Sequence, residues 1–131
     1  LARAGFIFKP VARSPDNVVC FMCHKSLDGW EAGDDPNEEH YRHSPECAWA
    51  VLHAPKDVLY GLDPSSDEIA RYRLETFGTW WPHDGKRGWV PTSEALAHAG
   101  FFYSPSRAGD DLAACRYCGL VLDGWEPKDS P

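Results

Sequence analysis

An internal repeat runs through the chain. Residues 1–36 align without a gap on residues 96–131, and sixteen of the thirty-six aligned positions are identical, among them a CxxC pair and a complete Asp-Gly-Trp-Glu segment. A copy of this length cannot bury an ordinary hydrophobic core, and small cores need a staple. The repeat therefore predicts two copies of one small module, and the stretch at 53–69 between them, rich in Pro, Ser and Asp, is typical of a linker.

The spacing of cysteine and histidine in the first copy matches a zinc site. Cys20 and Cys23 form the CxxC pair, sixteen residues separate Cys23 from His40, and six more separate His40 from Cys47. Three thiolates and one imidazole make a tetrahedral ligand set, and four protein ligands leave no open position for a reactive water. We therefore expect a structural zinc ion that folds the module and takes no part in catalysis.

Two other interpretations of the cysteines stay open on the residues alone. Free cysteine is among the most buried residue types, so these residues could be small core side chains without a metal. A redox pair fits less well, because no strand and long helix of the thioredoxin kind surround the CxxC. The chain has five cysteines, which cannot all pair in disulfides, and it shows no secretory leader and no apolar run of the ~18 residues that span a bilayer. These features favour an intracellular protein with reduced thiols.

The charge balance favours a basic partner. The formal net charge is −7, and nucleic acid is bound by basic surfaces, so DNA is not expected as the main partner. Carboxylates crowd residues 31–39, where they would speed the approach of a basic peptide. Acids at the start of a solvated helix would explain the same run equally well.

Short strands and short helices are predicted around these motifs, which makes the fold class α+β. Apolar runs bounded by polar turns predict strands at 5–8, 17–22 and 25–30. Helices are predicted at 35–43 with Asp35 as N-cap, at 46–53, from 67 to Pro82 with Ser66 as N-cap, and at 92–100 with Thr92 or Ser93 as N-cap and Gly100 at the end.

Several motifs resemble a known family. The segments LARAGF, CFMC, DGW, DDPNEEH and HSPEC, together with RLETFGTWWP at 73–82, are similar to those of the baculovirus inhibitor-of-apoptosis repeat (BIR) family. The resemblance covers 1–52 and 70–131. It implies a small zinc-stabilised α+β fold, with a three-stranded antiparallel sheet and a groove beside the last strand.

Each copy departs from the family pattern in its own way. RLETFGTWWP corresponds to the family's opening helix, which the first copy lacks upstream of Leu1. The second copy has Cys115 and Cys118, but no later His or Cys completes its zinc set. We therefore interpret the chain as two truncated tandem copies from a longer protein. Packing of 70–99 against 1–52, in cis or by swapping between chains, remains an alternative.

The DGW segment predicts a peptide site. Residues 25–30 should form an edge strand, to which an extended peptide can add as a further strand. Asp28 and Asp34 could hold a free α-amino group, and Leu27 with Trp30 could enclose a small first side chain such as Ala. Capture of a peptide by its N terminus is also what the resemblance implies. Taken singly, Trp30 could equally be a core aromatic and the acids a solvated rim.

Lys25 and His43 predict phosphate recognition. His43 follows His40 by three residues on one helix, so one ring can face the groove while the other binds zinc. With Lys25 it makes a paired cationic site suited to phosphate. The family's apoptosis-inhibiting branch usually has Trp at this position, whereas its survivin-like branch reads phosphothreonine at the third residue of the histone H-three tail. In the second copy Leu120 replaces the lysine, while the amine pocket is kept by Leu122, Asp123, Trp125 and Asp129.

These expectations describe a binding module and not an enzyme. By resemblance it is a histone-reading adapter of the chromosomal passenger complex in mitosis, placed in the nucleus at chromosomes and centromeres or in the cytoplasm, with mitotic kinase complex subunits as partners through regions outside the chain. The alternative is an inhibitor-of-apoptosis protein that binds caspases or processed N-terminal Ala peptides. A zinc hydrolase is disfavoured by the closed ligand set, and no catalytic residues or membrane contacts are predicted.

Overall fold

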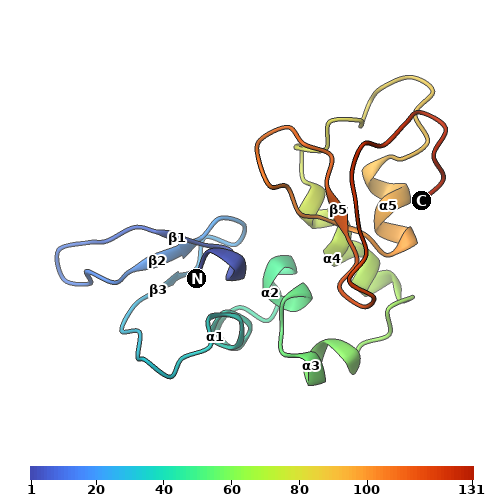
Figure 1. The fold of residues 1–131 in the computed structure, drawn as a ribbon. Helices are drawn as coiled ribbons and strands as arrows, with labels where there is room; N and C mark the ends of the chain where they lie inside the picture. Colours follow the sequence, from blue (N-terminus) through green and yellow to red (C-terminus); the bar gives the residue numbers. More distant parts are fainter. The chain divides into compact units, whose positions relative to one another are not determined.

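The computed structural model describes residues 1–131, and the chain separates into two compact units, Leu1–Leu59 and Tyr60–Pro131. Each unit has a three-stranded antiparallel sheet and short helices (Figure 1). The α+β class and the three-stranded sheet are thus confirmed. No helix is long and apolar enough to cross a bilayer.

The first unit builds its sheet from strands that are shorter than expected. Its elements are a 3-10 turn η1 (Ala2–Ala4), β1 (Phe6–Phe8), β2 (Val18–Cys20), β3 (Ser26–Leu27), α1 (Pro36–His43), α2 (Ala48–Leu52) and, at the boundary, α3 (Lys56–Tyr60). The strand order β1-β2-β3 leaves β3 at an edge, as predicted. The predicted strand 25–30 is wrong beyond Leu27, because Gly29 turns the backbone with φ 72° and the Trp30 N–H donates to Asp16 Oδ2 at 2.8 Å.

Helix α1 begins where its capping residues place it. The Asp35 side chain accepts hydrogen bonds from the N–H groups of Asn37 and Glu38, and Pro36 occupies the first turn. Acids in the first turn and basic residues in the last turn match the helix dipole. The Asp35 N-cap is therefore confirmed. The helix turns the His40 ring inward, where it is fully buried, and leaves His43 exposed.

The second unit holds two longer helices and its own sheet. Its elements are α4 (Asp67–Phe77), α5 (Ser93–Ala99), β4 (Phe102–Tyr103), β5 (Ala113–Ala114) and β6 (Val121–Leu122). The N-caps Ser66 and Thr92 are confirmed by their side-chain hydrogen bonds, and α5 ends at Gly100 with φ 106°. The predicted extension of α4 to Pro82 is wrong. Gly78 ends the helix with φ 50°, and a Cβ at Gly78 would lie 3.1 Å from the Trp80 ring.

The two sheets differ in what covers them. In the second unit Tyr103 is 2% exposed, stacks on Phe77 of α4 with ring centroids 5.8 Å apart, and meets Trp81 edge-on. Its outward N–H donates to Thr76 Oγ1 at 2.9 Å. Phe8 occupies the same repeat position in the first unit and is 67% exposed. Helix α4 thus supplies an apolar cover to the sheet of the second unit.

Candidate metal centre and groove

Four predicted metal ligands come together in the first unit. Cys20 ends β2, Cys23 lies in the following turn, His40 is on α1, and Cys47 immediately precedes α2. Their ligand atoms all lie within 4.8 Å of one another. Residues spread over 28 positions of sequence therefore form one possible zinc-binding group that joins the sheet to the helices.

The distances in this group fit a tetrahedral zinc ion. Cys20 Sγ lies 4.0 Å from Cys47 Sγ, and Cys23 Sγ lies 3.6 Å from His40 Nε2. A tetrahedron with zinc–ligand bonds of about 2.0–2.3 Å has edges of roughly 3.5–3.8 Å. His40 Nδ1 donates to the Ala4 carbonyl at 2.8 Å, which leaves Nε2 facing the sulfurs. A backbone partner of this kind orients metal-binding histidines in general.

The surroundings of the sulfurs attract positive charge. The pKa of Cys20 is lowered to about 3, chiefly by its hydrogen bond with Cys47, and the pKa of Cys47 is raised by the same bond. The N–H groups of Met22 and Cys23 also point at Cys20 Sγ, at 3.3 and 3.4 Å. Burial alone would lower the pKa of His40, but hydrogen bonds with Cys20 and Cys23 outweigh it and raise the pKa to about 9. Such a donor set suits a divalent cation.

A groove lies beside the edge strand of the same unit. It has a volume of about 230 Å³ and is lined by Leu27, Asp28, Gly29, Trp30, Asp34, Glu39 and His43. Five of these residues were predicted for the peptide site. The sixth predicted residue, Lys25, is exposed in the turn before β3 and does not line the groove.

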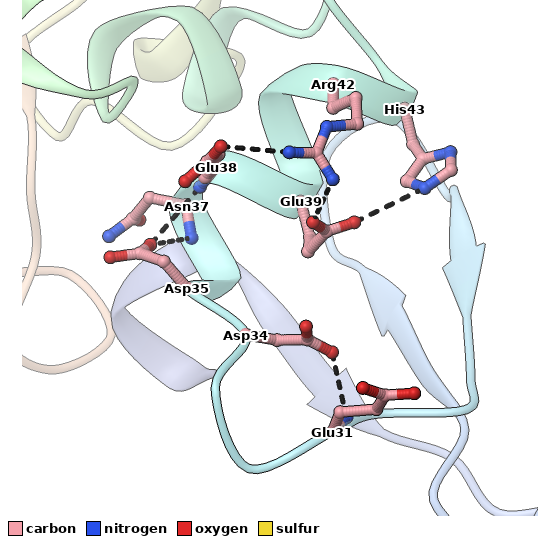
Figure 2. Close-up of polar contacts among 8 residues, drawn as sticks. All are labelled: Glu31, Asp34, Asp35, Asn37, Glu38, Glu39, Arg42 and His43. Carbon is pink, nitrogen blue, oxygen red and sulfur yellow. Dashed lines mark hydrogen bonds and ion pairs between the residues drawn. The ribbon is translucent and has the colours of Figure 1, made fainter.

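One groove carboxylate, that of Asp34, is held in place by a backbone group. Asp34 Oδ2 accepts the Glu31 N–H at 2.8 Å (Figure 2), which leaves the second carboxylate oxygen for a ligand. The same contact recurs in the second unit, where Asp129 Oδ2 accepts the Glu126 N–H at 2.8 Å. The loop after DGW thus presents a fixed carboxylate in both units.

Trp30 belongs both to the groove and to the core. Its ring packs edge-on against Phe6, with centroids 5.7 Å apart, and borders the cluster of buried residues around Val18. The indole Nε1–H is buried and has no hydrogen-bond partner. Trp30 therefore packs against the core and also lines the groove, and its contact with a peptide side chain stays a prediction.

Comparison with known proteins decides the family. The model of the Inhibitor of Apoptosis domain, BIR, matches residues 1–51 and 73–131. The chain belongs to the BIR family. The possible zinc group lies inside the first matched segment. The second matched segment contains the end of α4 and the second CxxC pair.

Relatives of two kinds match this BIR chain. The "Chromosomal passenger complex protein bir1" of Schizosaccharomyces pombe is 36% identical over 137 residues, covering 100% of this chain and 14% of that protein. "Baculoviral IAP repeat-containing protein 3" of Canis lupus familiaris is 35% identical over 132 residues, covering 100% and 20%. "Baculoviral IAP repeat-containing protein 5" of Mus musculus is 53% identical over 59 residues, covering 45% and 42%. The chain therefore spans less than half the length of each of these relatives.

The second BIR segment repeats the CxxC turn. The Gly119 N–H donates to the Cys115 carbonyl at 3.0 Å, as the His24 N–H donates to Cys20 at 3.1 Å. Burial would raise the pKa of Cys115, but N–H groups of the turn, the Cys118 side chain and the positive charge of Arg73 lower it. The second unit thus repeats the hydrogen-bonded CxxC turn of the first.

Sequence reasoning missed Glu39 as a groove residue. Its carboxylate lines the groove and lies 3.5 Å from His43 Nε2. The signal was present, because Glu39 and His43 are four residues apart on α1, the spacing that places side chains on one helix face. The carboxylate was interpreted as part of a general acidic run, and so its specific partner was overlooked.

Asp111 and Asp16 give a matched pair for a stability prediction. Asp111 accepts the N–H groups of Gly124 and Trp125 at 2.9 and 2.8 Å and the His83 ring nitrogen at 2.9 Å. Asp16, at the same repeat position, accepts one hydrogen bond from the DGW turn, from the Trp30 N–H at 2.8 Å. We expect Asp111→Asn to destabilise its unit by roughly 1.5–3 kcal/mol and Asp16→Asn to cost less. Hydrogen exchange of each DGW segment measures both.

Asp111 also predicts a dependence of stability on pH. Burial would raise the pKa of Asp111, but the hydrogen bonds from His83 and the two backbone N–H groups lower it. A lowered carboxyl pKa stabilises the fold above the unfolded value of about 4 and loses this effect as pH falls through the folded value. The difference between wild type and Asp111→Asn should therefore be full at neutral pH and shrink in acid. A difference that stays constant down to strongly acidic pH would contradict the assignment.

Proposed function

We propose that the first BIR unit binds the free N terminus of an extended peptide and reads a phosphate on its third residue. The observation that supports this most is the groove itself: an edge strand, fixed carboxylates and an exposed imidazole meet around one hollow of about 230 Å³. The zinc ion, where bound, would supply structure alone, since four protein ligands fill its coordination.

Each part of the groove has a role in this proposal. The peptide adds to β3 by backbone hydrogen bonds, which hold any sequence in an extended form. Asp28 and Asp34 receive the α-amino group, and a charge-assisted contact of this kind is about twice as strong as a neutral hydrogen bond. Leu27 and Trp30 enclose the first side chain, where there is room for Ala. The groove therefore selects a peptide by its free α-amino group and its first side chain.

Phosphate is assigned to the far end of the groove. The His43 side chain is 48% exposed there and can donate to a phosphate oxygen. Lys25 is exposed on the turn that leads into β3, and its flexible side chain can reach toward the same anion. An ammonium and an imidazole together suit a group that carries about −1.5 to −2 charges at neutral pH.

The biological role proposed is that of an adapter. The peptide is the phosphothreonine-bearing tail of histone H-three, and the protein serves the chromosomal passenger complex at centromeres in mitosis, together with mitotic kinase complex subunits. Support comes from the bir1 relative, whose name places it in that complex, and from His43, which stands where the apoptosis-inhibiting branch usually has Trp. The net charge of −7 also suits a basic histone tail.

The two units divide the work in this proposal. Residues 1–52 and 70–131 are two truncated BIR copies joined by 53–69, and only the first holds a full zinc set. The second keeps an amine pocket at Leu122, Asp123, Trp125 and Asp129, but Leu120 stands where the first has lysine. Phosphate reading is therefore assigned to the first unit alone.

Peptide titration tests the proposal. An Ala-Arg-Thr peptide is titrated with and without phosphate on Thr, and with its amine free or acetylated; an Ala-Val-Pro peptide represents the apoptosis-inhibitor alternative. We expect phosphate to tighten binding, acetylation to abolish it, His43→Ala to erase the phosphate preference and Asp34→Ala to weaken both Thr peptides alike. Tighter binding of Ala-Val-Pro than of the phosphopeptide would favour the alternative, and binding that ignores acetylation would refute amine capture.

A further inference from the structure

Three side chains of the loop after α4 are brought together by two successive turns. The Lys86 N–H donates to the His83 carbonyl at 3.3 Å, and the Trp89 N–H donates to the Lys86 carbonyl at 3.2 Å. Side chains three residues apart in such turns lie over one another, and the His83 and Trp89 rings stack with centroids 4.0 Å apart and planes at 11°. Lys86 Nζ lies over the Trp89 ring, 4.7 Å from its centroid. The loop thus gathers an amine, an imidazole and an indole on one side.

The imidazole links the lysine to a carboxylate of the second unit. His83 Nδ1 lies 3.1 Å from Lys86 Nζ, and His83 Nε2 lies 2.9 Å from Asp111 Oδ2. A lysine ammonium is a donor only, so Nδ1 accepts from Lys86 and the Nε2–H donates to Asp111. His83 is 8% exposed, whereas Lys86 is exposed. A buried imidazole with a fixed tautomer therefore lies beside an accessible amine.

We propose that Lys86 is a modification site, an amine that reacts with acyl thioesters, with His83 as its base and Asp111 as a positioning residue. A nucleophile, a base within hydrogen-bond reach and a third group that orients the base form the arrangement that activates nucleophiles in proteins. Asp111 is itself fixed by the N–H groups of Gly124 and Trp125, so the imidazole is held from both sides. The inference concerns the second unit and does not depend on the peptide function proposed above.

The reaction is an acyl transfer from sulfur to nitrogen. The uncharged Lys86 amine attacks the carbonyl carbon of the thioester, a nitrogen–carbon bond forms, and the nitrogen of the adduct carries a positive charge. His83 Nδ1 takes the proton from that nitrogen, and Asp111 stabilises the imidazolium that results. The carbon–sulfur bond then breaks, the thiolate leaves with the proton from the imidazolium, and a neutral amide remains on Lys86.

Selective acylation within the chain tests the proposal. Lys128 is an exposed lysine of the same unit and serves as the internal control. The whole chain is incubated with the acetyl thioester of coenzyme A at mildly alkaline pH, and the initial rates at the two lysines are measured by peptide mass spectrometry. Lys86 is expected to react about tenfold faster than Lys128, which is below the ~10²–10⁴-fold that a positioned base contributes in enzymes.

His83→Gln removes the base and keeps its hydrogen bonds. A Gln amide accepts from Lys86 and donates to Asp111, but it takes up no proton from the adduct, so Lys86 and Lys128 should react at equal rates. Hydrogen exchange at Trp125 verifies that the variant keeps its fold. Wild-type chain unfolded in urea provides a second comparison, which needs no variant: unfolding separates the imidazole from the amine, so the two rates should again be equal.

The outcomes distinguish a reactive cluster from a structural one. Equal rates at Lys86 and Lys128 in the folded wild type would overturn the proposal, because a cluster that only holds the loop in place gives the amine no advantage. A faster Lys86 that keeps its advantage in His83→Gln or in urea would overturn it as well, because exposure or neighbouring residues, and not the imidazole, would then explain the difference. None of these results bears on the peptide groove of the first unit.

Discussion

Chelation of zinc should unfold residues 1–59 and leave the fold of residues 60–131 largely in place. The buried cluster around the metal group consists of Ala4, Phe6, Val18, Cys20, Cys47 and Ala50, and two of these six are metal ligands. Structural zinc contributes about 10–16 kcal/mol of apparent binding free energy in small zinc modules, which matches or exceeds the whole stability of an ordinary domain, about 5–15 kcal/mol. Loss of amide hydrogen-exchange protection over 1–59 measures the effect.

Two histidines on α1 test whether loss of the metal, and not the substitution of any histidine on this helix, unfolds the first unit. His40→Asn should reproduce the effect of the chelator, because its ring is fully buried among the sulfurs. His43→Asn, three residues later and exposed, should keep zinc and fold. One zinc per chain by elemental analysis, lost on His40→Asn, is expected for the first unit. A protected first unit in a metal-free sample would contradict the structural role of the site.

The second large loss of stability is expected in the second unit, at Tyr103 on β4. Tyr103→Ala should cost about 3–5 kcal/mol, the range for truncation of buried aromatic residues, because the ring fills the space between Phe77 and Trp81. Its hydroxyl also donates to the Asp110 carbonyl at 2.9 Å, and that contact is lost with the ring. Urea unfolding followed by hydrogen exchange of β4 and α4 measures the loss.

The matched change in the first unit is Phe8→Ala. Phe8 occupies the same position of the repeat but is 67% exposed, so its truncation in this chain should change stability by no more than about 0.5 kcal/mol. Equal losses for the two substitutions would show that an apolar cover protects Phe8 as well. The comparison thus measures what α4 contributes to a BIR sheet.

Much of the site could be predicted from local chemistry. The four zinc ligands were identified by residue type and spacing, since only a few arrangements of thiolate and imidazole bind one ion. The N-caps Asp35, Ser66 and Thr92 were identified because short polar side chains satisfy the free N–H groups at a helix start. The caps are carried by residues a few positions apart, whereas the zinc set spans 28 positions and is recognised by its residue types and the CxxC pair.

Other features depended on contacts that sequence spacing does not encode. Strand β3 ends at Leu27 because a carboxylate fourteen residues earlier takes the Trp30 N–H. The end of α4 at Gly78 depends on a glycine conformation beside the Trp80 ring. Glu39 lines the groove and Lys25 does not. The direction of each side chain depends on the backbone that carries it, which is α1 for Glu39 and the segment before β3 for Lys25.

The sequence by itself determined the ligand set, the helix starts and the presence of a repeated module, since these follow from residue identity and short spacing. Only the tertiary structure decided which side chains line the groove, so that Glu39 lies in it and Lys25 does not. Burial and charge pairing depend on which surfaces meet in three dimensions. Residues at the same repeat position, such as Phe8 and Tyr103, can therefore differ in burial.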